Sequence, residues 1–152
     1  MLTMSDPYAL TTSLGYRMTL VSRISERRFE AALTPLGLSR VTWCVLMAVG
    51  QEDLQNPSDI ADWIGIDRTA TSRALKRLEA DGLITRAPGL TDKRTRITRA
   101  TPDGLDRLKQ AKAAAEENAT HFNAKLSWYE RDMLVTILNK LMQDESRGIP
   151  GL

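Results

Sequence analysis

The chain has 152 residues, a length typical of one domain that buries its own hydrophobic core. Its single cysteine, Cys44, excludes an internal disulfide framework, and no group of Cys and His has the spacing of a zinc site, so we expect no metal and no cofactor. The net charge is only +2, but nine Lys and Arg residues face four acids between Asp67 and Arg99, and this local excess of +5 predicts a phosphate-rich partner.

The first predicted helix begins at Leu10 and ends before Pro35 and Gly37. Its apolar residues step mostly by three or four, and charged residues fill much of the other faces: Leu14, Met18, Val21, Ile24, Phe29 and Leu33. Ser39 then has the position of an N-cap, and it predicts a second helix that ends at Gly50.

Two short segments predict a helix-turn-helix. Asn56 as N-cap and Pro57 at the first helical position begin a third helix, which ends at Gly65. Glycine tolerates the left-handed conformation that a tight turn requires. Asp67 immediately caps a fourth helix, and this order of short helix, glycine turn and capped helix is typical of the motif.

The fourth helix has two chemically different faces. Its apolar face contains Ala70, Ala74, Leu75 and Leu78, and the opposite face contains Thr69, Ser72, Arg73 and Lys76. The second set offers hydroxyl, ammonium and guanidinium donors, which suit base edges and phosphates. The alternative interpretation is the solvated face of an ordinary surface helix.

A basic hairpin follows this helix. Residues 83–86 and 95–99 predict two strands, and the Pro- and Gly-containing segment 87–92 predicts the loop between them. Arg94, near the tip, suits a narrow minor groove, and Asp92 is placed to hold its guanidinium group. The alternative is a mobile surface loop with an incidental ion pair.

Two further helices complete the chain. Thr101 and Pro102 begin a fifth helix that we expect to run to Leu126. Ser127 and Glu130 form a capping box for a sixth, whose broad apolar stripe is Met133, Leu134, Ile137, Leu138, Leu141 and Met142. This apolar surface exceeds what the central module needs, which favours a homodimer over a monomeric bundle.

The chain resembles the MarR family of winged helix-turn-helix regulators over nearly its whole length, and two motifs carry the resemblance. The first is Leu-Glu-x-x-Gly-Leu-Ile-x-Arg, formed by Leu78, Glu79, Gly82, Leu83, Ile84 and Arg86 after Leu75. The second is Asp92-Lys93-Arg94, followed by Thr101-Pro102-Asp103-Gly104. Ala100 departs from the family's usual Leu and weakens the apolar anchor between the second strand and the fifth helix.

The resemblance implies a mainly α fold with a small β-wing, a winged helix-turn-helix flanked by long N- and C-terminal dimerisation helices. The expected single domain spans residues 8–146, with a DNA-binding lobe at 38–100, dimerisation helices at 8–34 and 102–146, and disordered tails at 1–7 and 147–152. Major-groove contacts are expected from Arg68, Thr69, Thr71, Ser72, Arg73 and Lys76, and wing contacts from Asp92, Lys93, Arg94 and Arg96.

The implied function is that of a homodimeric, sequence-specific transcriptional regulator that binds a pseudo-palindromic operator on double-stranded DNA. We interpret it as a repressor that a small aromatic or phenolic acid releases, as is common in the family. Candidate pocket residues, chosen by position, are Tyr16, Arg17, Trp43, Met47 and His121. The alternative places Trp43 and Met47 in the core and leaves Arg17 and His121 as surface or interface residues.

Three other functional classes are alternatives to a transcriptional regulator. An enzyme is disfavoured because one histidine, one cysteine and no convergent carboxylates leave no general base with an orienting partner. A thiol switch at Cys44 is opposed by its apolar neighbours, and an architectural protein that binds DNA without sequence preference stays open. No apolar run is long enough to cross a bilayer and no signal segment is evident, so we expect a cytoplasmic protein.

Overall fold

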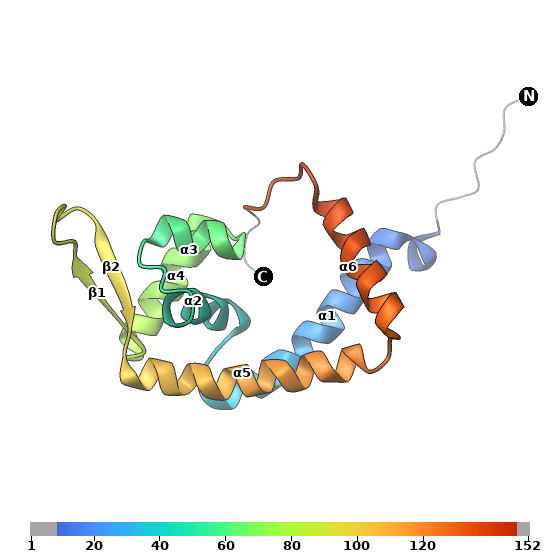
Figure 1. The fold of residues 1–152 in the computed structure, drawn as a ribbon, viewed down its shortest axis with the longest axis horizontal. Helices are drawn as coiled ribbons and strands as arrows, with labels where there is room; N and C mark the ends of the chain where they lie inside the picture. The colour runs from blue at the N-terminus through green and yellow to red at the C-terminus, as the bar shows by residue number, and fades with distance from the viewer. Residues whose placement is uncertain (1–8, 149–152) are drawn as a thin grey trace, which may run out of the picture.

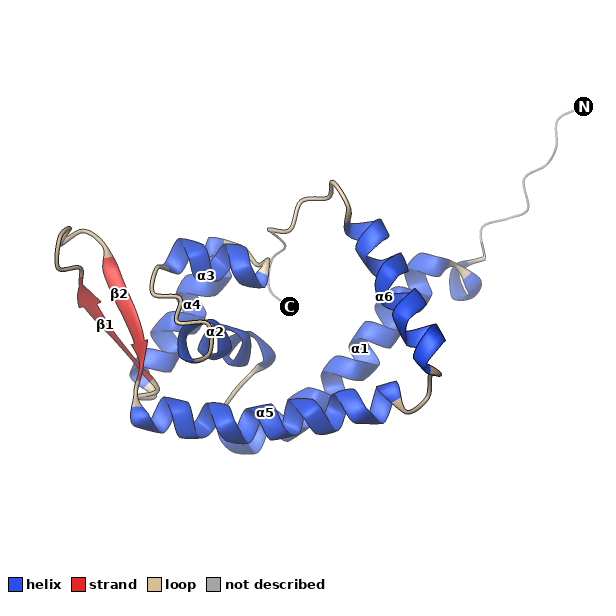
Figure 2. Cartoon of the chain, in the orientation of Figure 1, coloured by secondary structure: helices blue, strands red, loops and turns tan. Residues whose placement is uncertain are grey.

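The computed structural model describes residues 9–148 and is mainly helical (Figures 1 and 2). A short 3-10 turn (Leu10–Thr12) precedes α1 (Leu14–Leu33), a second 3-10 turn (Thr34–Leu36), α2 (Arg40–Gly50), α3 (Pro57–Ile64), α4 (Arg68–Ala80), β1 (Ile84–Pro88), β2 (Arg96–Ala100), α5 (Pro102–Asn123) and α6 (Trp128–Met142). The two strands pair antiparallel, from Ile84 opposite Ala100 to Pro88 opposite Arg96. The predicted fold class is confirmed.

The elements divide between the two ends of α5. The compact lobe formed by α2, α3, α4 and the β1–β2 hairpin lies at its beginning, and α6 follows its end (Figure 1). The second half of α1 packs along α5 and against α2. The predicted tail 1–7 lies outside the described residues, as do residues 149–152. Arg147, assigned to the other predicted tail, lies beside Gly65 at the turn between α3 and α4.

The hydrophobic core belongs to the lobe. Its fully buried large side chains come from α1, α2, α3, α4 and β1, and include Leu33, Leu46, Ile60, Leu75, Leu78 and Ile84. The apolar face predicted for the fourth helix is therefore confirmed. In α1, only Phe29 and Leu33 are buried, both in the last turns that reach the lobe. The rest of α1 leaves its apolar side chains exposed.

Side-chain caps fix most helix starts as the sequence predicts. The side chains of Ser39, Asn56, Asp67, Thr101 and Ser127 each accept a hydrogen bond from a backbone N–H of the first turn. In the predicted box before α6, the Ser127 N–H donates to the Glu130 carboxylate at 2.8 Å. This hydrogen bond stabilises the charged form and lowers the pKa of Glu130.

Three boundaries differ from the prediction by more than one residue. The first helix begins at Leu14 rather than Leu10, because Ser13 is its N-cap and accepts from the Tyr16 N–H. The first strand continues to Pro88, whose missing N–H is tolerated because the two-stranded sheet leaves this strand at an edge. α5 ends at Asn123, since residues 124–126 form the turn that leads to the Ser127 cap.

A close backbone contact joins the wing to α5. The Thr101 N–H donates to the Leu83 carbonyl at 3.0 Å, and its hydroxyl donates to the Gly82 carbonyl at 2.7 Å. Gly104, one turn into α5, is buried against the same Leu83 carbonyl, and a Cβ at this position would overlap that oxygen. Glycine is therefore required here for space, which explains the family-like Thr-Pro-Asp-Gly sequence.

Within residues 9–148, no single helix is both long and apolar enough to span a membrane. Only taken together are α1 with its 3-10 extension and α2 long and apolar enough, and these two segments are bent by 70° relative to one another.

We expect Gly104→Ala to lower the free energy of unfolding by about 1–3 kcal/mol or more, because the added methyl meets backbone that cannot rotate away. Chemical denaturation at fixed protein concentration measures this change. The matched control is Gly15→Ala in α1, where a Cβ meets nothing within 4 Å and alanine should stabilise by about 0.5–1 kcal/mol. Equal effects of the two substitutions would contradict the role assigned to Gly104.

Candidate nucleic-acid interface

The helix-turn-helix is built from α3, the turn at Gly65 and α4. Gly65 has a φ of +84°, in the left-handed region that favours glycine, and it caps α3. Ile66 is buried directly after the turn, and the Asp67 carboxylate then accepts from the Ala70 N–H at 2.6 Å. These local restraints fix the angle at which α4 leaves the turn.

α4 buries one face and exposes the other. Ala74, Leu75 and Leu78 are in the core, and the predicted major-groove residues that keep access to solvent are Arg68, Thr69, Ser72, Arg73 and Lys76. Five of the six predicted major-groove residues therefore lie on the accessible side of the helix. Ser72 is half-buried at the edge of this face, whereas the other four are exposed.

The burial of Thr71 contradicts its predicted contact with the major groove. Its side chain is 1% exposed, and its hydroxyl donates to the Asp67 carbonyl at 2.9 Å. Thr71 lies four residues before Leu75 and seven before Leu78, so helical geometry places it on the buried face. It stabilises the first turn of α4 from inside and is not accessible to a base.

The wing is attached to the lobe at two points. The Thr98 N–H on β2 donates to the Gln55 carbonyl before α3, at 3.0 Å. On β1, the Arg86 guanidinium lies 3.8 Å from the Glu79 carboxylate of α4. The hairpin therefore projects from the body of the lobe in a fixed relation to α4 (Figure 1).

The wing tip is a closed turn. The Gly89 N–H donates to the Thr95 carbonyl at 2.6 Å, and the Thr95 N–H donates to the Asp92 carbonyl at 3.1 Å. The Asp92 carboxylate accepts from the Arg94 backbone N–H at 2.9 Å. Asp92 thus orders the backbone of the tip, and the predicted contact with the Arg94 guanidinium is not formed. Instead, the carboxylate forms an Asx-type hydrogen bond with the backbone N–H two residues later.

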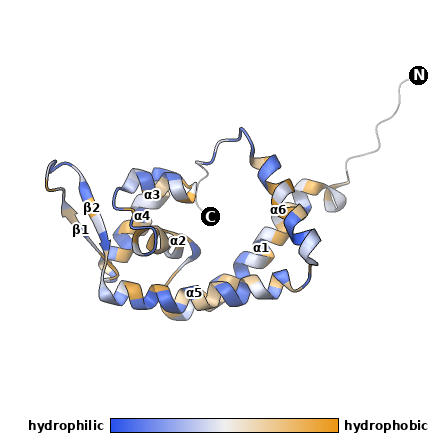
Figure 3. Cartoon of the chain, viewed as in Figure 1, coloured by the Kyte–Doolittle hydropathy of each residue, from blue (hydrophilic) through white to orange (hydrophobic). Residues whose placement is uncertain are grey.

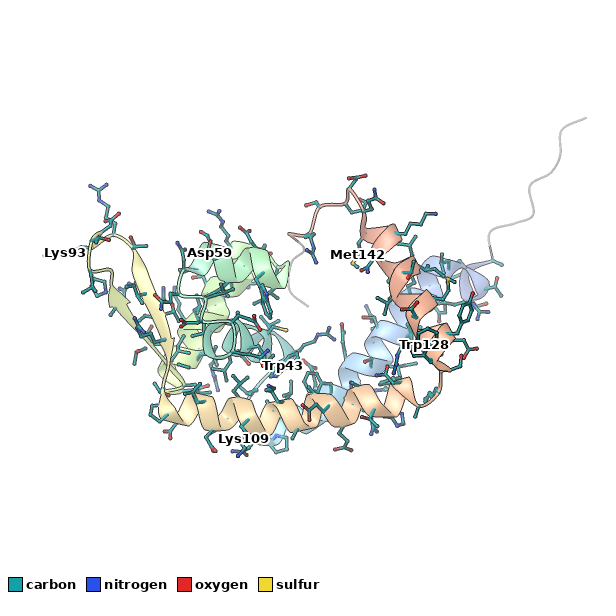
Figure 4. The ribbon with its side chains drawn as sticks, viewed as in Figure 1. Trp43, Asp59, Lys93, Lys109, Trp128 and Met142 are labelled. Carbon is teal, nitrogen blue, oxygen red and sulfur yellow. The ribbon has the colours of Figure 1, made fainter. Side chains whose placement is uncertain are left out.

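The charge that these elements expose is mostly positive. Two of the four acids of the segment are paired within it: Asp81 with Arg77 at 2.8 Å, and Glu79 with Arg86. The exposed cations without an acidic partner among the described residues are Arg68, Arg73, Lys76, Lys93, Arg94, Arg96 and Arg99. Lys93 extends into solvent from the wing tip (Figure 4). Their charge therefore stays available for an external anion.

The structure does not bring the five predicted pocket residues together within one chain. Tyr16 and Arg17 are exposed near the start of α1, where the Arg17 guanidinium donates to the Thr12 carbonyl at 3.3 Å. Trp43 and Met47 pack against the core of the lobe. His121 is exposed near the end of α5, and its pKa is lowered by desolvation and by the nearby charges of Arg28 and Lys125.

Two buried polar atoms lie on helices that pack against α1, one on α2 and one on α5. The Trp43 Nε1 and the Asn118 Oδ1 have no hydrogen-bond partner among the described residues. The Trp43 ring packs edge-on against Phe29, and Asn118 lines a cavity of about 230 Å³ with Arg28, Ala31 and Ala32 of α1. Sequence reasoning missed Asn118, because a polar residue on a long amphipathic helix gives no signal that its amide is buried.

Cys44 is half-buried on α2. Burial raises the pKa of its thiol, and the positive charge of Arg40 only partly offsets this effect. A neutral thiol is a poor nucleophile, which argues against a redox switch at this position. Within residues 9–148 no group of three or more His, Cys, Asp or Glu side chains is placed to bind a metal ion.

Residues 36–95, which contain α2, α3, α4, β1 and the wing tip, match the sequence model of the MarR family. The uncharacterized HTH-type transcriptional regulator YdgJ of Bacillus subtilis (strain 168) is 29% identical over 126 residues, covering 83% of this chain and 75% of that protein. The match to the MarR model and the similarity to these regulators together support a MarR-type DNA-binding transcriptional regulator.

Solved MarR-family structures share the fold. A mutant MarR from E. coli complexed with operator DNA superimposes with a TM-score of 0.80 at 23% identity, covering 91% of this chain and 99% of that one. Bordetella bronchiseptica BpsR, described with the regulation of its DNA binding by 6-hydroxynicotinic acid, gives a TM-score of 0.83 at 21% identity, covering 92% and 100%. The relatives are regulators rather than enzymes, which agrees with the prediction of a non-enzymatic protein.

Proposed function

We propose that this MarR-type regulator is a homodimer that binds a pseudo-palindromic operator, represses transcription, and is released by a small aromatic or phenolic acid. The observation that carries the proposal is the division of the chain into two surfaces. One end of α5 carries the exposed donors of α4 and the basic wing, and the other carries apolar helices that no part of residues 9–148 covers.

The DNA-binding part of the proposal assigns two grooves to two elements. α4 enters the major groove, where Thr69, Arg73 and Lys76 face base edges and phosphates. Arg94 enters the adjacent minor groove, since its guanidinium is exposed and the tip that carries it is ordered by Asp92. An operator-bound relative with the same fold supports this assignment.

The dimer rests on the apolar surface of α6. Every residue from Trp128 to Met142 is exposed, including Met133, Leu134, Ile137, Leu138, Leu141 and Met142. Apolar residues recur along both α6 and the first half of α1 (Figure 3). Burying these faces against a second copy removes them from water, and it holds two α4 helices for half-sites about 34–36 Å apart.

The effector part rests on the buried, unpartnered atoms of Trp43 and Asn118. An aromatic acid with a ring hydroxyl offers an acceptor to the Trp43 N–H, a donor to the Asn118 oxygen and a ring that packs on apolar walls. Regulation of BpsR by 6-hydroxynicotinic acid supports this ligand class. Release requires that the ligand bind more tightly to the dimer when the spacing of its two lobes is incompatible with DNA than when the spacing is compatible.

We expect binding to the regulator's own promoter DNA to weaken steeply as salt rises, because each phosphate contact releases counterions. Arg94→Ala should weaken binding about tenfold and reduce the salt slope by about one, while leaving the fold intact. Gel shift in a salt series measures both effects. Lys109→Ala, an exposed cation on α5 that lies away from the wing (Figure 4), is the control and should behave as wild type.

Two results would contradict this assignment: tight binding that is indifferent to salt, or equal loss of affinity in the Arg94 and Lys109 variants. Equal affinity for promoter and random duplex would instead favour an architectural protein over a sequence-specific regulator.

We expect sedimentation to give twice the mass of the chain at micromolar concentration, and Leu138→Glu to yield a monomer because it places a charge in the apolar interface. Thr136→Glu introduces the same side chain on the opposite side of α6, where the Thr136 hydroxyl donates to the Asp132 carbonyl, and should remain dimeric. A monomeric wild type, or identical behaviour of both variants, would disprove the dimer.

We expect 6-hydroxynicotinic acid, or a hydroxybenzoic acid, to raise the melting temperature of the wild type by selective binding to the folded state. Asn118→Leu removes the side-chain amide and Trp43→Phe removes the indole N–H, while each leaves an apolar side chain to pack, and both should abolish the shift. Thermal-shift titration measures it. An unchanged shift in both variants would exclude this site, and no shift with any acid of the series would exclude the ligand class.

A further inference from the structure

Leu90, at the tip of the wing, exposes nearly its whole apolar side chain. It is 97% exposed, the largest value among the exposed large hydrophobic residues of the described chain. Most of the others lie on α1 and α6, where a second copy covers them in the proposed dimer. The wing lies at the opposite end of α5 (Figure 1), so dimerisation through those helices leaves Leu90 uncovered.

The tip holds Leu90 in a defined position. Gly89 precedes it and donates to the Thr95 carbonyl across the base of the turn, while Asp92 and Arg94 close its far side. A Cβ at Gly89 would lie 2.7 Å from the Asp92 carbonyl oxygen, so the turn is tightly closed behind Leu90. The side chain points away from this closed ring of backbone into solvent.

The surroundings of Leu90 indicate what covers it. Lys93 and Arg94 are exposed three and four residues later, and they lie on the same turn. An apolar side chain beside two cations matches a minor groove, where phosphates line the rims and the floor and sugar edges are less polar. Leucine is among the residues that minor-groove proteins place there.

We propose that Leu90 packs against the floor of the minor groove beside Arg94 and makes the regulator discriminate A·T from G·C pairs at the wing position. Guanine carries an exocyclic 2-amino group in this groove, and an isobutyl group pressed against it leaves that donor without a partner. A·T pairs carry no such donor. This inference rests on the proposed DNA binding and adds to it a residue that sets sequence preference.

The test uses a duplex selected from a random library with the wild-type protein, in which the minor-groove step protected by the wing is mapped by hydroxyl-radical footprinting. At that step A·T, G·C and inosine·C pairs are compared. Inosine lacks the 2-amino group but keeps the major-groove edge of guanine. The wild type should bind A·T and inosine·C equally and G·C about fivefold more weakly.

Leu90→Ala should bind the A·T duplex about fivefold more weakly, lose the G·C penalty and keep the wild-type salt slope, because the lost contact is apolar. Arg94→Ala should reduce the salt slope. Thr91→Ala, an exposed neighbour on the same turn, is the matched control and should behave as wild type.

Wild-type affinity in Leu90→Ala, or a G·C penalty that persists in this variant, would overturn the inference while leaving the proposed DNA binding intact. A penalty that persists with inosine·C would overturn it too, since the 2-amino group would not be its cause. Failure of the wild type to select any duplex would instead remove the proposed function, and the inference with it.

Discussion

The contact between Leu83 and the start of α5 is the constraint on which this architecture depends. The Leu83 carbonyl accepts from Thr101, and Gly104 packs against the same carbonyl with no room for a side chain. Leu83 lies between α4 and the first strand of the wing, and Thr101 and Gly104 lie at the start of the long α5 helix. α4 and the wing are therefore joined to the arm formed by α5 and α6 through backbone packing rather than by a flexible linker.

This junction explains how a small lobe is coupled to distant helices. α5 begins beside the wing, packs along α1 and leads to α6, so a rotation of the arm moves α4 and the wing together. Trp43 of α2 packs against Phe29 of α1, and Asn118 of α5 lines a cavity with the same helix. In the proposed function, a ligand bound to these residues would change the orientation of the lobe without contacting DNA, which is the physical requirement for allosteric release.

Local chemistry predicts most of this fold because helix starts are decided within four residues. The caps at Ser39, Asn56, Asp67, Thr101 and Ser127 follow from side chains that reach the first free N–H groups of their own helices. The same reasoning failed at Leu10, where Ser13 competes as the cap. The exposed face of α4 was equally predictable, since it depends on helical periodicity alone.

The sequence by itself determined the order of the elements, the polar face of α4, the basic wing and the apolar surplus of α6, because each follows from composition at short spacing. Only the tertiary structure decided that the Leu83 carbonyl packs against Gly104, that the Asn118 amide oxygen is buried, and that the start of α1, with Tyr16 and Arg17, does not meet Trp43 of α2. These properties depend on which segments pack together across long stretches of chain. No spacing rule within one helix contains that information.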